Sequence, residues 1–149
     1  MPTPYESATL NLQLFDLRRE PVLREARAWF LSEFNPETLE DAVRQVSGHR
    51  NASFRMVLGY WDMAASLVTT GAIDANAFTA AHGEAFLTLA KVYPFLNELR
   101  AMSGEADYCQ HLERVVLATP DAEAIMTRRR AAAIAAARAQ AGTAAPSAD

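Results

Sequence analysis

The segment from residue 54 to residue 70 most constrains the fold, because its apolar side chains repeat at helical spacing along its whole length. At about 100° per residue, one stripe contains Phe54, Val57, Leu58, Trp61, Ala65 and Val68. A second, adjoining stripe contains Met56, Tyr60, Met63 and Leu67. A surface helix needs an apolar stripe of only ~100°, and these two stripes together cover more than half of the circumference. The pattern therefore predicts a helix at the centre of a helical bundle.

The remaining face of this helix is a narrow edge made of Arg55, Gly59, Asp62 and Ser66. Asp62 belongs to this edge and not beside Trp61, because neighbours in sequence point about 100° apart on a helix. The ordinary interpretation is an edge that is solvated or paired in salt bridges. The alternative is a shallow groove over the small residues Gly59 and Ser66, where another helix or a second copy of the chain packs. We keep these four residues as a hypothetical interface.

Helical spacing continues through most of the chain, and strand signals are nearly absent. We expect helices over residues 5–19, 36–46, 51–70, 74–102 and 105–118, with further helices starting near residues 21 and 120. Gly71 is placed to end the central helix, Asp74 to cap the next one, and Pro94 to kink or split it. The chain is thus predicted to be all-α, one bundle of six or seven helices over residues 1–141, with a disordered tail over 142–149.

Composition and charge narrow the possible functions. The formal net charge of −4 argues against non-specific binding of nucleic acid. The single cysteine, Cys109, excludes an internal disulfide framework and suits a reducing compartment. No secretory signal peptide is evident at the start of the sequence, and no run of ~18–20 apolar residues predicts a membrane span. We therefore expect a cytoplasmic protein.

Catalytic and metal-binding patterns are hard to find. Asp107 and His111 lie four residues apart on an expected helix, a spacing that permits half of a metal site but is also common for an ordinary ion pair. His82 falls on an apolar helical stripe, where a buried imidazole usually finds one hydrogen-bond partner. Cys109 lies on another apolar stripe without an evident activating base. The sequence predicts no catalytic residues, metal or cofactor.

The aromatic residues suggest one further hypothesis. They concentrate in the middle helices, and helical bundles often hold small-molecule pockets with aromatic walls and a few polar tips. Tyr60, Trp61, His82 and Tyr93 would line such a pocket. Aromatic stripes are more often simply core, so this pocket is the alternative interpretation.

The middle of the chain, from Phe54 to Val116, resembles a group of small all-helical bacterial proteins classified only as a domain of unknown function. The resemblance is carried by Tyr60-Trp61, Leu67-Val68, Gly71-Ala72-Ile73-Asp74, Phe95-Leu96 and Arg100. It implies an all-α fold and a bacterial source. It implies no activity and assigns no catalytic residue.

Two functional hypotheses remain. The first is a non-enzymatic interaction or scaffold module, which self-associates as a homodimer or binds another protein. Two observations favour it: no catalytic pattern is evident, and the central helix is apolar almost all round. The alternative is a bundle that binds a small molecule in the aromatic pocket. An enzyme ranks third.

Overall fold

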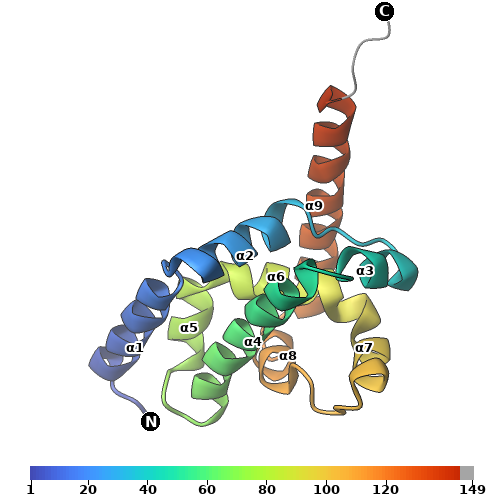
Figure 1. The fold of residues 1–149 in the computed structure, drawn as a ribbon. Coiled ribbons are helices and arrows are strands. Elements are labelled where there is room, and N and C mark those ends of the chain that lie inside the picture. The colour runs from blue at the N-terminus through green and yellow to red at the C-terminus, as the bar shows by residue number, and fades with distance from the viewer. Residues whose placement is uncertain (145–149) are drawn as a thin grey trace, which may run out of the picture.

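The computed structural model describes residues 1–144, and every regular element in that range is helical (Figure 1). The elements are α1 (Pro4–Leu17), α2 (Pro21–Ser32), α3 (Leu39–Gln45), α4 (Arg50–Thr69), α5 (Ala75–Ala81), α6 (Gly83–Val92), the 3₁₀ turn η1 (Tyr93–Phe95), α7 (Leu96–Ser103), α8 (Gln110–Leu117) and α9 (Ala122–Ala144). The all-α, single-domain prediction is confirmed. The described range holds more helices than the six or seven expected, because one expected helix is divided.

α4 occupies the centre of the bundle, as its two apolar stripes predicted. It packs against α2 on one side and α8 on another, and Trp61 and Leu58 are fully buried in it. The second stripe is buried only in part. Tyr60 lies in the core, but Met56 and Met63 remain partly exposed because no helix among the described residues covers that side.

The end of α4 follows the predicted signals. Gly71 adopts a left-handed φ of 82°, which glycine reaches without steric cost, and the amides of Ala72 and Ile73 both donate to the carbonyl of Leu67. The side chain of Asp74 then accepts from the amide of Ala77 and caps α5 at a distance of 2.9 Å.

The expected helix over 74–102 is broken twice. At Pro94 the chain forms the 3₁₀ turn η1, which confirms the predicted kink. The second break, at His82, was not predicted: this residue leaves helical geometry (φ −124°, ψ 57°) and separates α5 from α6. Its imidazole is directed instead to a hydrogen bond with Asn11 of α1. A long-range contact therefore overrides local helical propensity here.

Two other helices begin later than expected. α3 starts at Leu39 and not at Pro36, because Thr38 supplies the N-cap by accepting from the amide of Asp41. α8 starts at Gln110 and not at residue 105, after a turn in which Cys109 has a left-handed φ of 58°.

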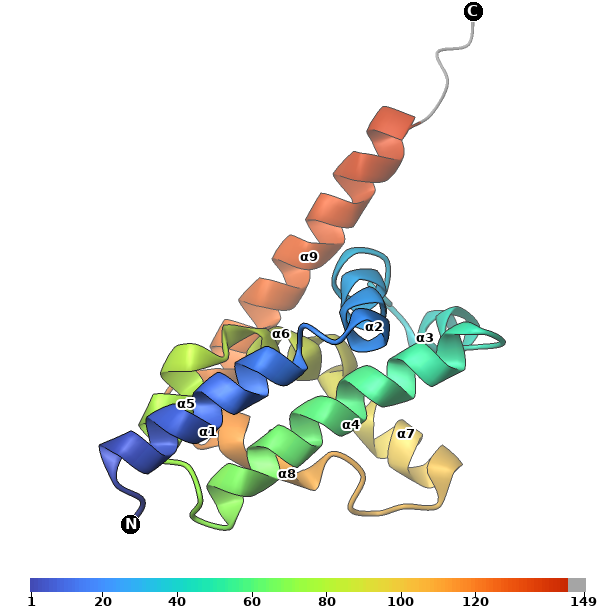
Figure 2. The same cartoon turned by 60° about the vertical axis from the view of Figure 1, so that its left-hand side comes forward.

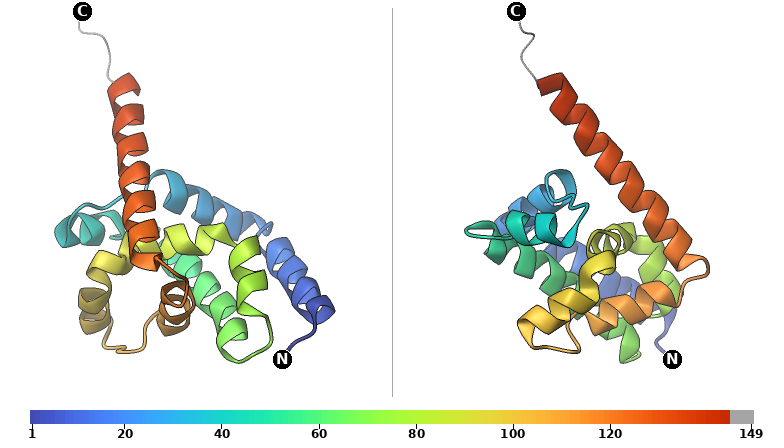
Figure 3. Two further views of the ribbon diagram at one scale, coloured as in Figure 1. Left: turned by 180° about the vertical axis from the view of Figure 1, so that it is seen from behind. Right: turned by 90° about the vertical axis from the view of Figure 1, so that its right-hand side faces the viewer.

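α9 rises beyond the other helices on the side of the molecule away from α1 (Figures 2 and 3). Two arginines of α9 fix its course: Arg130 donates to the carbonyl of Pro36, and Arg138 binds the carboxylate of Glu37. The expected end of the bundle at residue 141 falls inside α9, and residues 145–149 of the expected tail lie outside the described residues.

Across residues 1–144, no helix combines the length and the apolar character needed to cross a bilayer.

Candidate functional site

α1 is attached to the bundle by a stripe that is mostly polar, which we call the anchoring stripe: Ser7, Asn11, Leu14 and Arg18. These positions are spaced by four, three and four residues, so they share one side of the helix. The hydroxyl of Ser7 accepts from the amide of Asp74 at 3.0 Å. The side chain of Arg18 reaches Glu84 at 3.2 Å.

The middle of the anchoring stripe contacts the aromatic residues that the sequence singled out. The Nε2 atom of His82 lies 2.9 Å from the carbonyl oxygen of the Asn11 side chain. The hydroxyl of Tyr60 donates to the backbone carbonyl of Leu14. Both contacts are buried, so α1 is held in a defined register by directional bonds and not by apolar packing alone.

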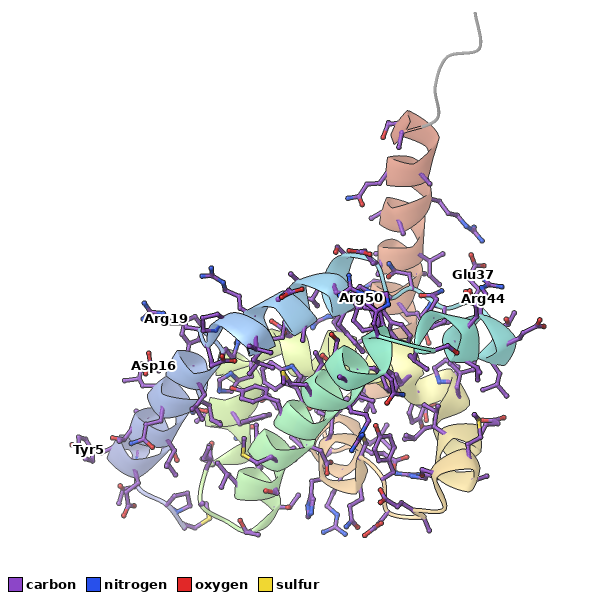
Figure 4. The ribbon with its side chains drawn as sticks, viewed as in Figure 1. Tyr5, Asp16, Arg19, Glu37, Arg44 and Arg50 are labelled. Atoms are coloured by element: carbon purple, nitrogen blue, oxygen red, sulfur yellow. The ribbon has the colours of Figure 1, made fainter. Side chains whose placement is uncertain are left out.

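A neighbouring side of α1, about a third of a turn around the helix from the anchoring stripe, is apolar and faces away from the bundle. This outward face consists of Tyr5, Ala8, Leu12 and Phe15, of which Tyr5 is 80% exposed, Leu12 72% and Phe15 53%. Figure 4 shows Tyr5 at one end of α1, and Asp16 and Arg19 at the other, all directed away from the body. The guanidinium of Arg18 lies over the Phe15 ring and covers it in part, whereas Tyr5 and Leu12 are mostly open. A helix with polar contacts inside and apolar residues outside reverses the usual arrangement.

Sequence reasoning missed this reversal. Helical spacing alone groups Leu10, Leu14 and Leu17 on one side of this helix, with Leu12 and Phe15 beside them. The structure buries Leu14 but leaves Leu17 more than half exposed. The spacing of Ser7, Asn11 and Arg18 places three polar residues on one side of the helix. That pattern indicates the buried side only when their hydrogen-bond partners in other helices are known.

His82 is buried, with an exposed fraction of 1%, between α1 and the aromatic rings of α4 and α5. Its ring lies 5.6 Å from that of Trp61 and 4.8 Å from that of Phe78. Burial, with a smaller contribution from the positive charge of Arg18, lowers the pKa of His82 from 6.5 to about 4. Because Nε2 faces the Asn11 oxygen, that nitrogen carries the proton of the neutral ring, and Nδ1 finds no partner among residues 1–144.

Three of the four hypothetical pocket residues therefore come together: Tyr60, Trp61 and His82 form one buried group. Tyr93 is only partly buried, and its hydroxyl donates to Glu123 of α9 at 3.3 Å. The indole nitrogen of Trp61 has no hydrogen-bond partner among the described residues.

A cluster of charges lies beside this group. Glu84 of α6 binds Arg27 through both carboxylate oxygens, at 2.7 and 2.5 Å, and also binds Arg18. All three side chains are at least 86% buried. The hydrogen bonds that Arg27 donates to the Glu84 carboxylate raise the pKa of Arg27. A carboxylate that two arginines neutralise is a structural anchor and not a free base, and this cluster fastens α1 and α2 to α6.

Lys91 is a second buried charge that the sequence did not reveal. Its ammonium donates to the carbonyls of Phe30 and Leu31, at 2.8 and 2.9 Å, and so satisfies the C-terminal end of α2. Burial lowers the pKa of Lys91 to about 8.

The hypothetical interface on α4 divides into two parts. The carboxylate of Asp62 accepts from the amide of Leu112 at 2.9 Å and so caps α8, for which Cys109 provides no side-chain cap. Ser66 bonds within its own helix, to the carbonyl of Met63. Arg55 and Gly59 are exposed and line a hollow.

This hollow, the α4–α7 groove, has a volume of about 580 Å³ and lies between α4, α7 and the chain that leads into α8. It is lined by Val46, Asn51, Phe54, Arg55, Leu58, Gly59, Asp62, Leu99, Met102, Ser103, Glu105, Tyr108 and Cys109. Burial raises the pKa of the Cys109 thiol to about 12, so it is not a reactive nucleophile at neutral pH.

The Asp107–His111 pair does not form on a helix. Asp107 lies in the turn before α8, and the Nδ1 atom of His111 lies 2.8 Å from the hydroxyl of Thr69. Among residues 1–144, no group of three or more histidine, cysteine, aspartate or glutamate side chains is arranged to hold a metal ion.

Fold and surfaces together define a class: a small all-helical domain whose N-terminal helix is anchored by polar contacts and presents an apolar face. The chain belongs to the family described as domain of unknown function DUF4760, whose family model matches residues 5–118. The match covers α1 to α8 and agrees with the resemblance seen in the middle of the sequence; α9 lies beyond it. Neither the curated proteins nor the solved structures yield a match.

Proposed function

We propose that this protein is a non-enzymatic interaction module that self-associates, and that the outward face of α1 is its contact surface. The observation that supports this is the reversal of α1: Leu12 and Phe15 are exposed while Ser7 and Asn11 are buried. A helix on the edge of a monomer usually turns its apolar side inward. An apolar side that is turned outward, on a helix held in register by specific bonds, favours a partner that covers it.

The energetic gain from covering this face is substantial. Full burial of one large apolar side chain contributes about 1.5–3 kcal/mol, and the outward face holds three such residues in Tyr5, Leu12 and Phe15. Association loses rotational and translational freedom, so these residues support binding only when they act together.

The narrow edge of α4 stays a second hypothetical interface. Asp62 already bonds the backbone of α8 in the same chain, so it is less available to a partner than the sequence suggested. Arg55 and Gly59 remain accessible in the α4–α7 groove. The outward face of α1 is the better supported surface because its large apolar residues are themselves exposed.

Sedimentation velocity over a range of micromolar concentrations tests the proposal. The wild-type protein is expected to form a dimer, and a variant with Leu12→Ser and Phe15→Ser is expected to be monomeric. Met102→Ser is the matched control, since Met102 is 62% exposed but lies in the α4–α7 groove; this variant should still dimerise. Circular dichroism should show equal helix content in all three. A wild-type protein that stays monomeric throughout would refute the proposal.

A second candidate function, small-molecule binding, is favoured by the α4–α7 groove. Its volume of about 580 Å³ lies within the range of ~300–1,000 Å³ that is typical of ligand pockets. The buried group of Tyr60, Trp61 and His82 would be reached only by a ligand that opens the core, so the groove is the more accessible position.

Native mass spectrometry of protein purified without added ligand tests this second candidate. A bound small molecule should add a defined mass to the wild-type protein. Gly59→Leu, which places a large side chain in the groove, should remove that mass, whereas the variant with Leu12→Ser and Phe15→Ser should retain it. Absence of an added mass in the wild-type protein, together with unchanged binding of an apolar fluorescent dye in Gly59→Leu, would count against this function.

A further inference from the structure

The residues on the outward face of α1 are spaced symmetrically along the chain on either side of Leu12. Tyr5 lies seven residues before Leu12, so the two lie close to one line along α1, and Arg19 lies seven residues after Leu12, in the turn that directly follows α1. Ala8 and Asp16 lie four residues to either side of Leu12, also on this face. Tyr5 and the Asp16–Arg19 pair are exposed, at opposite ends of the helix (Figure 4).

From this order we infer that two copies of the chain pair through their α1 helices in antiparallel orientation, with the two Leu12 side chains meeting at the two-fold axis. This inference rests on the proposed function and specifies the partner of the same surface. An axis through Leu12 places Tyr5 opposite the partner's Arg19, and Ala8 opposite the partner's Asp16. Phe15 then packs beside Leu12 of the partner subunit.

Charge complementarity selects this orientation. Arg19 and Asp16 form a weak pair within one chain, 3.6 Å apart, with side chains that are 74% and 79% exposed. In an antiparallel pair the guanidinium of Arg19 can lie over the ring of the partner's Tyr5, an attractive cation–π contact that occurs twice. In a parallel pair Arg19 would meet the partner's Arg19, and Asp16 the partner's Asp16, which is repulsive.

The shape of the face suits close packing of the two helices. Ala8 is small, so the partner helix can approach without displacing a large side chain, and packed helices lie about 8–10 Å apart. An antiparallel arrangement also sets the positive N-terminal end of each helix dipole beside the negative C-terminal end of the other.

Disulfide mapping tests the pairing, with three single variants: Leu12→Cys, Tyr5→Cys and Arg19→Cys. The native Cys109 is buried and does not compete. Under mild oxidation, Leu12→Cys is expected to give a covalent dimer, because two copies of one position meet only at the axis. Tyr5→Cys alone and Arg19→Cys alone should give none. An equimolar mixture of the last two should cross-link, since those positions face each other.

A charge reversal provides an independent readout. Arg19→Glu should weaken dimerisation on the order of tenfold, because two contacts with Tyr5 are lost. Arg24→Glu, an exposed position on α2, is the matched control and should leave the dimerisation constant unchanged.

The outcomes separate this inference from the proposed function. A wild-type protein that is monomeric by sedimentation overturns both. A dimer in which Tyr5→Cys cross-links by itself shows a parallel pair and overturns the antiparallel one. A dimer in which none of the three cysteines cross-links leaves self-association standing but excludes α1 as the contact surface.

Discussion

His82 should make the fold sensitive to acid over a defined pH range. Its pKa is about 4 in the folded protein against 6.5 for the exposed side chain, because the ring is buried and Arg18 lies nearby. Between these two values the unfolded chain binds a proton that the folded chain does not, so the free energy of unfolding falls as the pH is lowered. The loss from this one residue amounts to about 2 kcal/mol by pH 5 and about 3 kcal/mol by pH 4.

Urea denaturation followed by circular dichroism at pH 7, 6, 5 and 4 measures this loss. His82→Gln is the comparison, because glutamine can still bond Asn11 but does not titrate. The variant is expected to be less stable at pH 7, yet its stability should fall between pH 7 and pH 5 by about 2 kcal/mol less than that of the wild-type protein. Carboxylates present in both proteins contribute equally and cancel in this difference.

Equal losses in the two proteins would refute the reasoning. They would mean that His82 titrates alike in the folded and unfolded states, and therefore that its ring is hydrated in solution. Hydrogen exchange of the α1 amides gives a second readout. Because His82 holds α1 through Asn11, the protection of the α1 amides relative to their intrinsic exchange rate at each pH should fall on acidification before that of the α8 amides does.

Three substitutions test other parts of the structure by thermal or urea denaturation. Gly59→Ala should stabilise the protein by about 0.5–1 kcal/mol, since nothing lies within 4 Å of the added methyl group, whereas Gly71→Ala should destabilise it because φ there is 82°. Asp62→Ala should cost about 1 kcal/mol through loss of the acceptor for the Leu112 amide, and Asp62→Asn, which keeps an acceptor oxygen, should cost less. Glu84→Gln should cost about 3 kcal/mol, because it leaves two buried guanidinium groups without their charge partner; a loss below that of Asp62→Ala would show that the cluster is hydrated.

Structural features that depend on only a few neighbouring residues could be predicted from the sequence. Gly71, Asp74 and Pro94 mark helix ends through backbone geometry that depends on the residue itself, and the structure confirms all three. The central place of α4 was also readable, since two apolar stripes cannot be buried at the surface of a bundle.

Features that depend on a contact with a residue far away in the sequence could not be predicted. His82 breaks a helix because Asn11, seventy-one positions earlier, binds its ring. Asp62 caps a helix that starts far along the chain, so on its own helix it resembled a surface charge. In both cases the residue satisfies a polar group that only the tertiary fold brings near, and periodicity within one segment contains no information about that group.

The two sides of α1 are energetically connected. Hydrogen bonds such as those of Ser7 and Asn11 fix the position of the helix, but each contributes only about 1 kcal/mol net of the water it displaces. A helix held mainly in this way detaches more easily than one held by apolar packing. A second copy that covers Leu12 and Phe15 would bind only the state in which α1 is docked on its own bundle. By mass action, its binding would stabilise that docked state. Self-association and the docking of α1 would then strengthen each other, and the buried bonds to His82 and Asp74 would determine which side of the helix the partner meets.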